Sequence, residues 1–412
     1  MRHVAISWVA GLWFAAGAFA GCSDDESGAV PAPDAGGGSG GSAGSAGSGG
    51  SASGRGGAAG TGGTGNGGVS GAGTGGTGSN VDASGGSAGA VGSSGTGGAP
   101  GGFIRDAYPN DVGIAADPRV IFHSDFERDF EGWTRHTNDS TRIAVLNEAG
   151  LANSGTKYLR AQVTRTALAA DQNISANAQH DFSRRVPQMY FRFHARFVGN
   201  TAIPHHWVRI AAGDSGYASD GLANTVPPGD GGFWYDLDVR RDLTFNFYVY
   251  WYKMRSGRCN DGTTVPGCAG DQGTTYHYGN NFTPAGQSPF ARDAWFCLEV
   301  FTKANTVGQS DGELALYVND ALAGEYKPGV PRGRWLRDNF YSWGQYFEDV
   351  QAFEGFDFRS SADVLLKRIT LDAYYQKDTL DELAATTPVP EAQVILYDDV
   401  VVATERIGCR AP

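Results

Sequence analysis

Hydrophobic and polar residues alternate in several segments of the chain, and the clearest of these covers residues 189–197. Its apolar face holds Phe191, Phe193, Ala195 and Phe197. Its charged face holds Arg192, His194 and Arg196. Because successive side chains of a strand point to opposite faces, this period of two predicts a β-strand with one buried face.

Residues 245–253 alternate in the same way, and here the face away from the core is aromatic. The expected inward residues are Phe247, Val249 and Trp251. The expected outward residues are Asn246, Tyr248, Tyr250 and Tyr252. A tyrosine offers both an apolar ring and a hydroxyl, so this row predicts a binding platform.

The same criterion predicts eight further strands, separated mostly by clusters of Gly, Pro, Asn and Asp. They lie at residues 119–123, 157–163, 205–210, 233–240, 295–303, 313–319, 364–372 and 394–403. Long helical periodicity is missing from the sequence, and residues 379–385 alone suggest a short helix. We therefore predict an all-β fold, a two-sheet antiparallel β-sandwich of the jelly-roll kind.

Composition divides the chain, because residues 36–102 contain 32 of the 62 glycines in the 412-residue sequence. Such a Gly/Ser-rich segment cannot bury enough apolar surface to offset chain entropy, so we predict a disordered tether. A self-associating glycine-rich repeat is the alternative. Residues 22–35 form a short acidic segment before the tether, and residues 103–412 remain as one globular domain.

Charge narrows the possible partners of that domain. The whole chain has a formal net charge of −12, and residues 103–412 carry 30 Lys and Arg against 39 Asp and Glu. Nucleic-acid-binding domains carry a basic stripe for phosphates, so we expect no nucleic-acid partner. We also expect a monomer that requires no cofactor.

The N-terminus has the layout of a secretory signal, with Arg2 and His3 before an apolar stretch that ends at Ala20. Residues 1–21 end in small residues directly before Cys22, a pattern that resembles the bacterial lipobox. An ordinary signal peptide is the alternative. We expect export, lipidation at Cys22 and a place at the outer membrane or cell surface, with the lipid as the only membrane contact.

Four cysteines remain after Cys22, and an even number in an oxidising compartment favours disulfides. Three pairings are possible. Nearest-neighbour reasoning favours Cys259 with Cys268, which bracket a Gly/Pro/Asp-rich loop, and therefore Cys297 with Cys409. A zinc site is less favoured, because the sequence has no CxxC pair.

A series of motifs in the second half of the domain resembles a known family. They are Tyr278-Gly279, Trp295-Phe296-Cys297-Leu298-Glu299-Val300, Lys303-Ala304-Asn305, Asp311-Gly312-Glu313-Leu314, and Leu396-Tyr397-Asp398-Asp399. In this order they look like the concanavalin-A-like jelly roll of polysaccharide lyases, especially the alginate and glucuronan lyases of family 14. The resemblance covers roughly residues 185–409 and implies an acidic polysaccharide as partner.

In that family a Tyr-x-Tyr pair lies on the concave sheet, and residues 248–250 match it. The family's Ser-x-Arg pair on the preceding strand is replaced by Asp236-Leu237-Asp238, with Arg240 following. The family's Lys-Leu-Pro-Gly-Leu motif is also missing, and residues 204–210 occupy its approximate place.

Eliminative cleavage of a uronate polymer needs a base for the C5 proton, a cation beside the carboxylate and an acid for the leaving oxygen. A tyrosine suits proton transfer when a nearby cation lowers its pKa. The predicted catalytic residues are Tyr248, Tyr250, His206 and Arg209. The predicted substrate-binding residues are Arg192, His194, Asp238, Arg240, Asn246 and Tyr252.

Two other functions remain open at this level. Non-catalytic, lectin-like carbohydrate binding would use the same tyrosine row without chemistry. A retaining glycosidase needs two close carboxylates, and Asp236 and Asp238 alternate suitably but lack the Glu that usually follows. We predict no catalytic metal. Asp125 and Glu127 with Asp398 and Asp399 are candidates for a structural Ca²⁺, although solvated turn acids are the simpler interpretation.

Overall fold

The computed structural model describes residues 102–214, 225–256, 277–336, 339–342 and 351–409. These residues belong to one unit, Gly92–Pro412. Two large sheets make up most of the described part, which confirms the predicted all-β sandwich. Every strand pairing within these two sheets is antiparallel except that of β11 (Asn280–Phe282) with β16 (Asn339–Ser342).

The first sheet, here called sheet A, runs in the order β14-β13-β12-β7-β20-β4-β3, with β1 also paired to β20. Its strands are β1 (Val120–Ser124), β3 (Ile143–Leu146), β4 (Tyr158–Thr164), β7 (Gln188–Phe197), β12 (Phe296–Lys303), β13 (Glu313–Val318), β14 (Ala321–Tyr326) and β20 (Ala392–Ala403).

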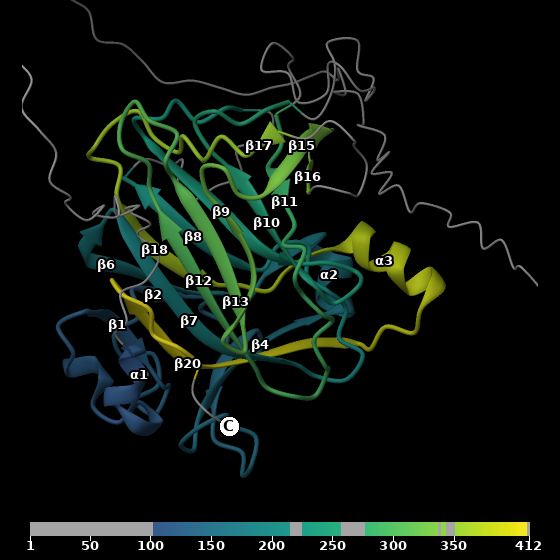
Figure 1. Cartoon of the computed structure of the whole chain (residues 1–412). Coiled ribbons are helices and arrows are strands. Elements are labelled where there is room, and N and C mark those ends of the chain that lie inside the picture. Colours follow the sequence, from purple (N-terminus) through teal and green to yellow (C-terminus); the bar gives the residue numbers. More distant parts are fainter. Residues whose placement is uncertain (1–101, 215–224, 257–276, 337–338, 343–350, 410–412) are drawn as a thin grey trace, which may run out of the picture. The chain divides into compact units, whose positions relative to one another are not determined.

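The second sheet, sheet B, runs in the order β17-β15-β16-β11-β10-β9-β8-β18-β6-β2. Its remaining strands are β2 (Arg135–His136), β6 (Ala178–Val186), β8 (Val208–Gly213), β9 (Gly232–Val239), β10 (Phe245–Tyr250), β15 (Arg332–Leu336), β17 (Gln351–Ala352) and β18 (Leu366–Leu371). Figure 1 shows β10, β9, β8 and β18 side by side in this sheet.

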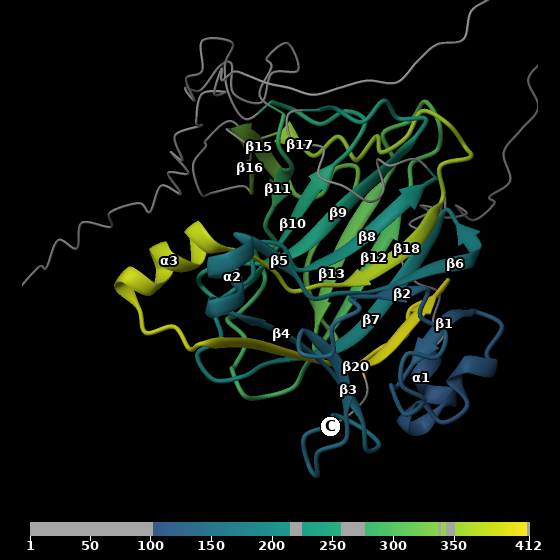
Figure 2. The same ribbon diagram turned by 180° about the vertical axis from the view of Figure 1, so that it is seen from behind.

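Short elements complete the described part. The helices are α1 (Ile104–Ala107), α2 (Arg165–Asp171) and α3 (Lys377–Thr386), and the 3-10 turns are Pro109–Asp111 and Ile114–Ala116. A small two-stranded sheet joins β5 (Asn173–Ser175) to β19 (Tyr374–Gln376). The views in Figures 1 and 2 agree that α1 lies beside β1 and β20, far from α2 and α3. None of the helices in the described ranges is long and apolar enough to span a membrane.

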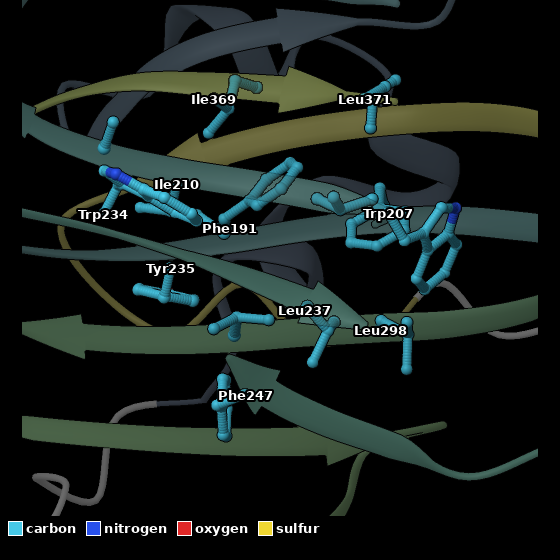
Figure 3. Packing of buried hydrophobic residues seen from close by; sticks show 14 of the residues in the cluster. Phe191, Trp207, Ile210, Trp234, Tyr235, Leu237, Phe247, Leu298, Ile369 and Leu371 are labelled. Carbon is cyan, nitrogen blue, oxygen red and sulfur yellow. The ribbon is translucent and has the colours of Figure 1, made fainter. Parts of the chain in front are cut away.

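The core lies between the two sheets and is rich in aromatic residues. Phe193 of β7 and Trp207, just before β8, pack edge to face with ring centroids 5.5 Å apart. Figure 3 shows Phe191, Trp207, Leu237 and Leu298 within this cluster. The residues predicted to point inward in segments 189–197 and 245–253 are all buried, with at most 2% of their surface exposed. Alternation therefore identified their core faces correctly.

Segments from both ends of the domain cover the outer face of sheet A. Ile104 and Ile114 pack with Val401, Ala403 and Ile407 in a small second cluster of buried residues. The backbone near α1 also donates hydrogen bonds to the carbonyls of residues 406 and 407. These contacts cover the outer face of sheet A, on which the alternation of residues 189–197 places Arg192 and His194.

The disulfide predicted between Cys297 and Cys409 is confirmed, with Cα atoms 5.8 Å apart and a sequence separation of 112 residues. It ties the end of the described chain to β12. The second predicted pair, Cys259 with Cys268, lies outside the described residues. The signal segment, Cys22, the acidic segment and the tether up to residue 101 lie outside them as well.

Candidate functional site

The outer face of sheet B carries polar residues that β8, β9 and β10 bring into line. Tyr248 is paired with Asp236 across β10 and β9, and Asp236 is paired with Arg209 across β9 and β8. Directly paired residues of adjacent strands point to the same face. Tyr248, Asp236 and Arg209, which come from separate stretches of sequence, are thus neighbours on one face.

His206 lies two residues before β8 and is held by two carboxylates. Its Nδ1 is 3.1 Å from Oδ2 of Asp238 and 3.4 Å from Oδ2 of Asp236. The backbone N–H of Trp207 donates to Oδ1 of Asp238 at 3.0 Å, which fixes that carboxylate. The imidazole is one-fifth exposed, so it is oriented by protein contacts and still reachable.

Arg209 makes a two-pronged ion pair with Asp236. Its Nε donates to Oδ1 at 2.7 Å, and its Nη2 donates to Oδ2 at 2.9 Å. The guanidinium carbon also lies 4.1 Å from the centre of the Trp234 ring. Trp234 in turn stacks on Tyr250 at 4.5 Å. A substrate carboxylate that approaches Arg209 would therefore compete with Asp236 for the guanidinium.

Tyr248 and Tyr250 form a linked pair whose ring centres are 5.6 Å apart. Interaction between the two hydroxyls favours the neutral form of Tyr248, and the Gly279 backbone N–H lies near both phenols. A Cβ at Gly279 would lie 2.4–2.6 Å from the Tyr248 ring. Glycine is therefore required here so that the backbone can reach the hydroxyl pair, which gives a physical reason for the Tyr278-Gly279 motif.

The pKa values of these groups define their protonation states at neutral pH. Burial lowers the pKa of His206, but the charges of Asp238 and Asp236 outweigh burial and raise the pKa to about 8. Burial raises the pKa of Tyr248 well above its ordinary value and also raises the pKa of Tyr250. The expected lowering of a tyrosine pKa by a neighbouring cation is thus absent. At neutral pH the site offers an imidazolium and two neutral phenols.

His206, Asp236 and Asp238 are the residues in the described part whose spacing suits a metal ion, with ligand atoms within 4.8 Å of one another. Both carboxylates already accept charge-assisted hydrogen bonds from Arg209 or contact His206. The same contacts bear on the glycosidase alternative, because neither carboxylate is available as a free nucleophile.

The four acids considered for calcium all accept hydrogen bonds from the protein itself. Asp398 accepts hydrogen bonds from the backbone of Asn153 at 2.9 Å, and Asp399 accepts one from the Asn153 side chain at 2.6 Å. Glu127 accepts from Thr156 and Lys157 instead. The Ca²⁺ site stays a prediction that these contacts do not test.

Arg192 and His194 lie on the other sheet, where the ends of the domain cover them. Arg192 is fully buried, and its Nη1 donates to Asp111 at 3.1 Å and to the Gly408 carbonyl at 3.2 Å. His194 is also buried, with Nδ1 3.7 Å from Asp399. We therefore remove both from the candidate site, because β7 belongs to sheet A and its polar face is not exposed.

The other predicted binding residues lie at the margins. Asn246 is paired with Asp238 and is buried by Asn281 and Thr283. Arg240 follows β9 and donates to Thr283 at 3.3 Å. Tyr252 lies beyond the end of β10, with the Lys253 ammonium 4.5 Å from its ring, so it does not continue the row.

Sequence reasoning missed Trp234 and Tyr374 as residues of the site. The alternation of Trp234 with Asp236 and Asp238 contained the signal for the first. Tyr374 comes from β19 and lies parallel to the His206 ring at 6.0 Å. Its place depends on a bridge between distant segments, for which the local sequence carries no signal.

No family model matches this sequence, and no curated protein matches it. Solved structures do match. An endo-β-1,4-glucuronan lyase from the fungus Trichoderma reesei has 13% identity and a TM-score of 0.41, covering 69% of this chain and 96% of its own. An alginate lyase from a Chlorella virus has 14% identity and a TM-score of 0.44, covering 69% and 100%. A marine alginate lyase from Aplysia kurodai has 14% identity and a TM-score of 0.43, covering 70% and 97%.

Proposed function

We propose that this protein is a lyase that cleaves a uronic-acid polymer by β-elimination on the outer face of sheet B. The observation that carries the proposal is the position of Tyr248, whose ring centre lies 5.1 Å from that of His206. A base and an acid that must act on neighbouring atoms of one sugar linkage need this kind of separation. The motif resemblance described above supports the same class of reaction.

In the proposed reaction, neutral His206 removes the C5 proton, and the electron pair forms the C4–C5 double bond as the C4–O bond breaks. Tyr248 donates its phenolic proton to the leaving oxygen. The imidazolium then returns a proton to the phenolate, which restores both groups. Arg209 offsets the substrate carboxylate, and Tyr250 holds the Tyr248 hydroxyl in place.

The raised tyrosine pKa supports the role of acid, since a phenol that stays neutral keeps its proton until the leaving oxygen develops charge. Because the pKa of His206 is about 8, about half of the molecules carry a neutral His206, able to act as a base, at that pH. Turnover should therefore rise as the pH approaches and passes 8.

Alginate, glucuronan and pectate are the polymers to test, with formation of the unsaturated uronate product followed by ultraviolet absorbance. Tyr248→Phe keeps the ring and removes only the hydroxyl, so turnover should fall by about 10²-fold or more. Tyr252→Phe is the matched control, because Tyr252 lies beyond the strand. The lyase proposal fails if no polymer yields the product or if Tyr248→Phe keeps full turnover.

A second candidate is carbohydrate binding without catalysis. It is favoured by one observation, namely that the site's two cations already contact carboxylates of the protein. In that case Tyr248→Phe should leave binding unchanged, whereas Tyr248→Ala should weaken it by about 1 to 3 kcal/mol through loss of stacking. Binding of a polymer without any product would identify this function.

We further propose export and lipidation at Cys22, as the charged and apolar layout of residues 1–21 suggests. Globomycin, which blocks cleavage of lipoprotein signals, should cause the uncleaved precursor to accumulate in the wild type. The Cys22→Ala variant should not respond to the drug. Identical processing of both forms in its presence would contradict the proposal.

A further inference from the structure

Polar residues on sheet B form a continuous row that runs well beyond the candidate site. Each member is the direct partner of the next across neighbouring strands, from β2 at one end to β10 at the other. The row consists of Arg135, Gln179, Thr370, Arg209, Asp236 and Tyr248. Direct partners share a face, so all six lie on the face that carries the candidate site. Gln179, Thr370 and Asp236 are buried, so a ligand can reach the row at Arg135, Arg209 and Tyr248.

The row has the length of an oligosaccharide. It crosses five intervals between neighbouring strands, and a spacing of about 4.8 Å gives a distance of about 24 Å between its ends. That distance is several times the width of one sugar ring. A polymer lying across the strands at Tyr248 would therefore reach Arg135 with a sugar distant from the cleaved linkage.

Arg135 differs from Arg209 and Arg368, two other arginines of this surface. Arg209 is paired with Asp236, and Arg368 of β18 donates to Asp181 at 2.6 and 3.0 Å. Arg135 is exposed, and it takes part in no ion pair with any residue that the structure describes. Its positive charge is the one in this group that a protein carboxylate does not already offset.

The guanidinium of Arg135 is nevertheless held in place. Its Nε and Nη2 both donate to Oε1 of Gln179, at 3.1 and 2.8 Å. Gln179 is buried, and its Nε2 donates to Asp181 at 3.1 Å, so its amide orientation is fixed as well. A positioned guanidinium loses less conformational freedom on binding an anion than a free one does.

We infer that Arg135 binds the carboxylate of a distal uronate and that the substrate-binding surface extends along this row from β10 to β2. The inference rests on the proposed function, because it assigns the same polymer a second contact. Charge-assisted hydrogen bonds from a guanidinium to a carboxylate suit such a contact. The site should consequently prefer long acidic oligosaccharides to short ones.

The test compares uronate oligosaccharides of increasing length by calorimetry, using the Tyr248→Phe protein throughout so that ligands are not consumed. Affinity should rise with length, and Arg135→Ala should lower it about fivefold for the longest ligands, the loss expected for one exposed ion pair. Disaccharide binding should not change. Arg135→Lys should restore part of the loss, and added salt should diminish it.

Arg184→Ala is the matched control. Arg184 is an exposed arginine of the adjacent strand β6, but it donates to the Pro118 carbonyl at 3.0 Å and is not a member of the row. If Arg135→Ala and Arg184→Ala have equal effects, or if Arg135→Ala weakens long and short ligands alike, the inference is wrong. If no uronate oligosaccharide of any length binds, the proposed function itself fails, and the two failures are thereby distinguished.

Discussion

The protonation of His206 gives the sharpest test of the site. Its Nδ1 contacts Asp238 at 3.1 Å and Asp236 at 3.4 Å, and the Asp236 carboxylate is shared with Arg209. Asp238→Asn removes one negative charge while keeping an oxygen that can accept from the Trp207 backbone N–H. With that oxygen on Trp207, the amide NH2 faces His206 Nδ1 and can only donate to it, so the change removes both the charge and the acceptor that favour the imidazolium.

The magnitude follows from the pKa of His206, which its carboxylate neighbours raise from 6.5 to about 8 against the opposing effect of burial. At 1.36 kcal/mol for each pKa unit, this difference corresponds to about 2 kcal/mol of preference for the charged imidazole in the folded state. In Asp238→Asn, two effects on the pKa of His206 remain. Burial still lowers it, and the Asp236 carboxylate, which would raise it, is already paired with Arg209. The pKa of His206 should then fall to its ordinary value or below.

The sign of the effect on stability is fixed by linkage. Because the pKa of His206 is higher in the folded than in the unfolded state, its contribution is complete below pH 6.5 and is lost as the pH rises through about 8. Asp372 titrates in the same range, since burial raises its pKa to about 7. Comparison with His206→Gln cancels that contribution.

Two measurements check the prediction. Nuclear magnetic resonance of the His206 ring should give a pKa near 8 in the wild type and at least one unit lower in Asp238→Asn. Urea unfolding should show that between about pH 6 and about pH 9 the wild type loses about 2 kcal/mol more than His206→Gln does. A wild-type pKa at or below 6.5, or one that Asp238→Asn does not move, would refute the electrostatic account of this site.

Three further predictions concern the frame around the site. Replacing Cys297 and Cys409 together by serine should lower the unfolding free energy by about 5 kcal/mol in the chain-entropy model, as measured by urea unfolding, and a loss below about 1 kcal/mol would contradict that model. Asp111→Ala leaves a buried guanidinium without its carboxylate and should cost about 3 to 5 kcal/mol in the same assay, whereas an unchanged stability would show that the pair is not needed. Gly279→Ala would place a methyl carbon 2.4 Å from the Tyr248 ring, so turnover should fall with little loss of stability, and full turnover would show that the ring can move freely.

Local pattern was sufficient to predict most of the central strands. Residues 189–197 and 245–253 alternate cleanly, and both form strands with the expected core faces, although the second strand ends at Tyr250. The helix expected at residues 379–385 appears as α3. These elements were predictable because one buried face imposes a period on each of them.

Strand β6 was not predicted, and its sequence explains why. Residues 178–186 carry polar side chains at Gln179, His180 and Asp181 in succession, so no alternation is visible. One face of β6 contributes Gln179 to the polar row. On the other face, the His180 ring stacks on Phe122 of β1 with ring centres 3.8 Å apart. A strand whose two faces both meet polar or aromatic partners leaves no period of two in the sequence.

The assignment of residues to the site failed where it depended on what covers a face. Alternation places Arg192 opposite the core correctly, yet it cannot tell that the segment around Asp111 closes over that side. Tyr250 lies on the predicted face, but Trp234 stacks on it and buries it. The segment around Asp111 is 81 residues from Arg192 in sequence, so only the tertiary structure reveals that it covers this face.

The charge balance of the site affects both the binding of an acidic polymer and the proposed removal of its C5 proton. Arg209 and protonated His206 carry two positive charges, which Asp236 and Asp238 offset. An acidic polymer therefore meets a neutral centre near pH 7 and a negative one once His206 gives up its proton. In the proposed lyase reaction, binding of the polymer and removal of the C5 proton would place opposite demands on this imidazole. A cation outside the pairings, such as Arg135, can retain the polymer while His206 is neutral, and this is why a distal contact is of particular value to a lyase.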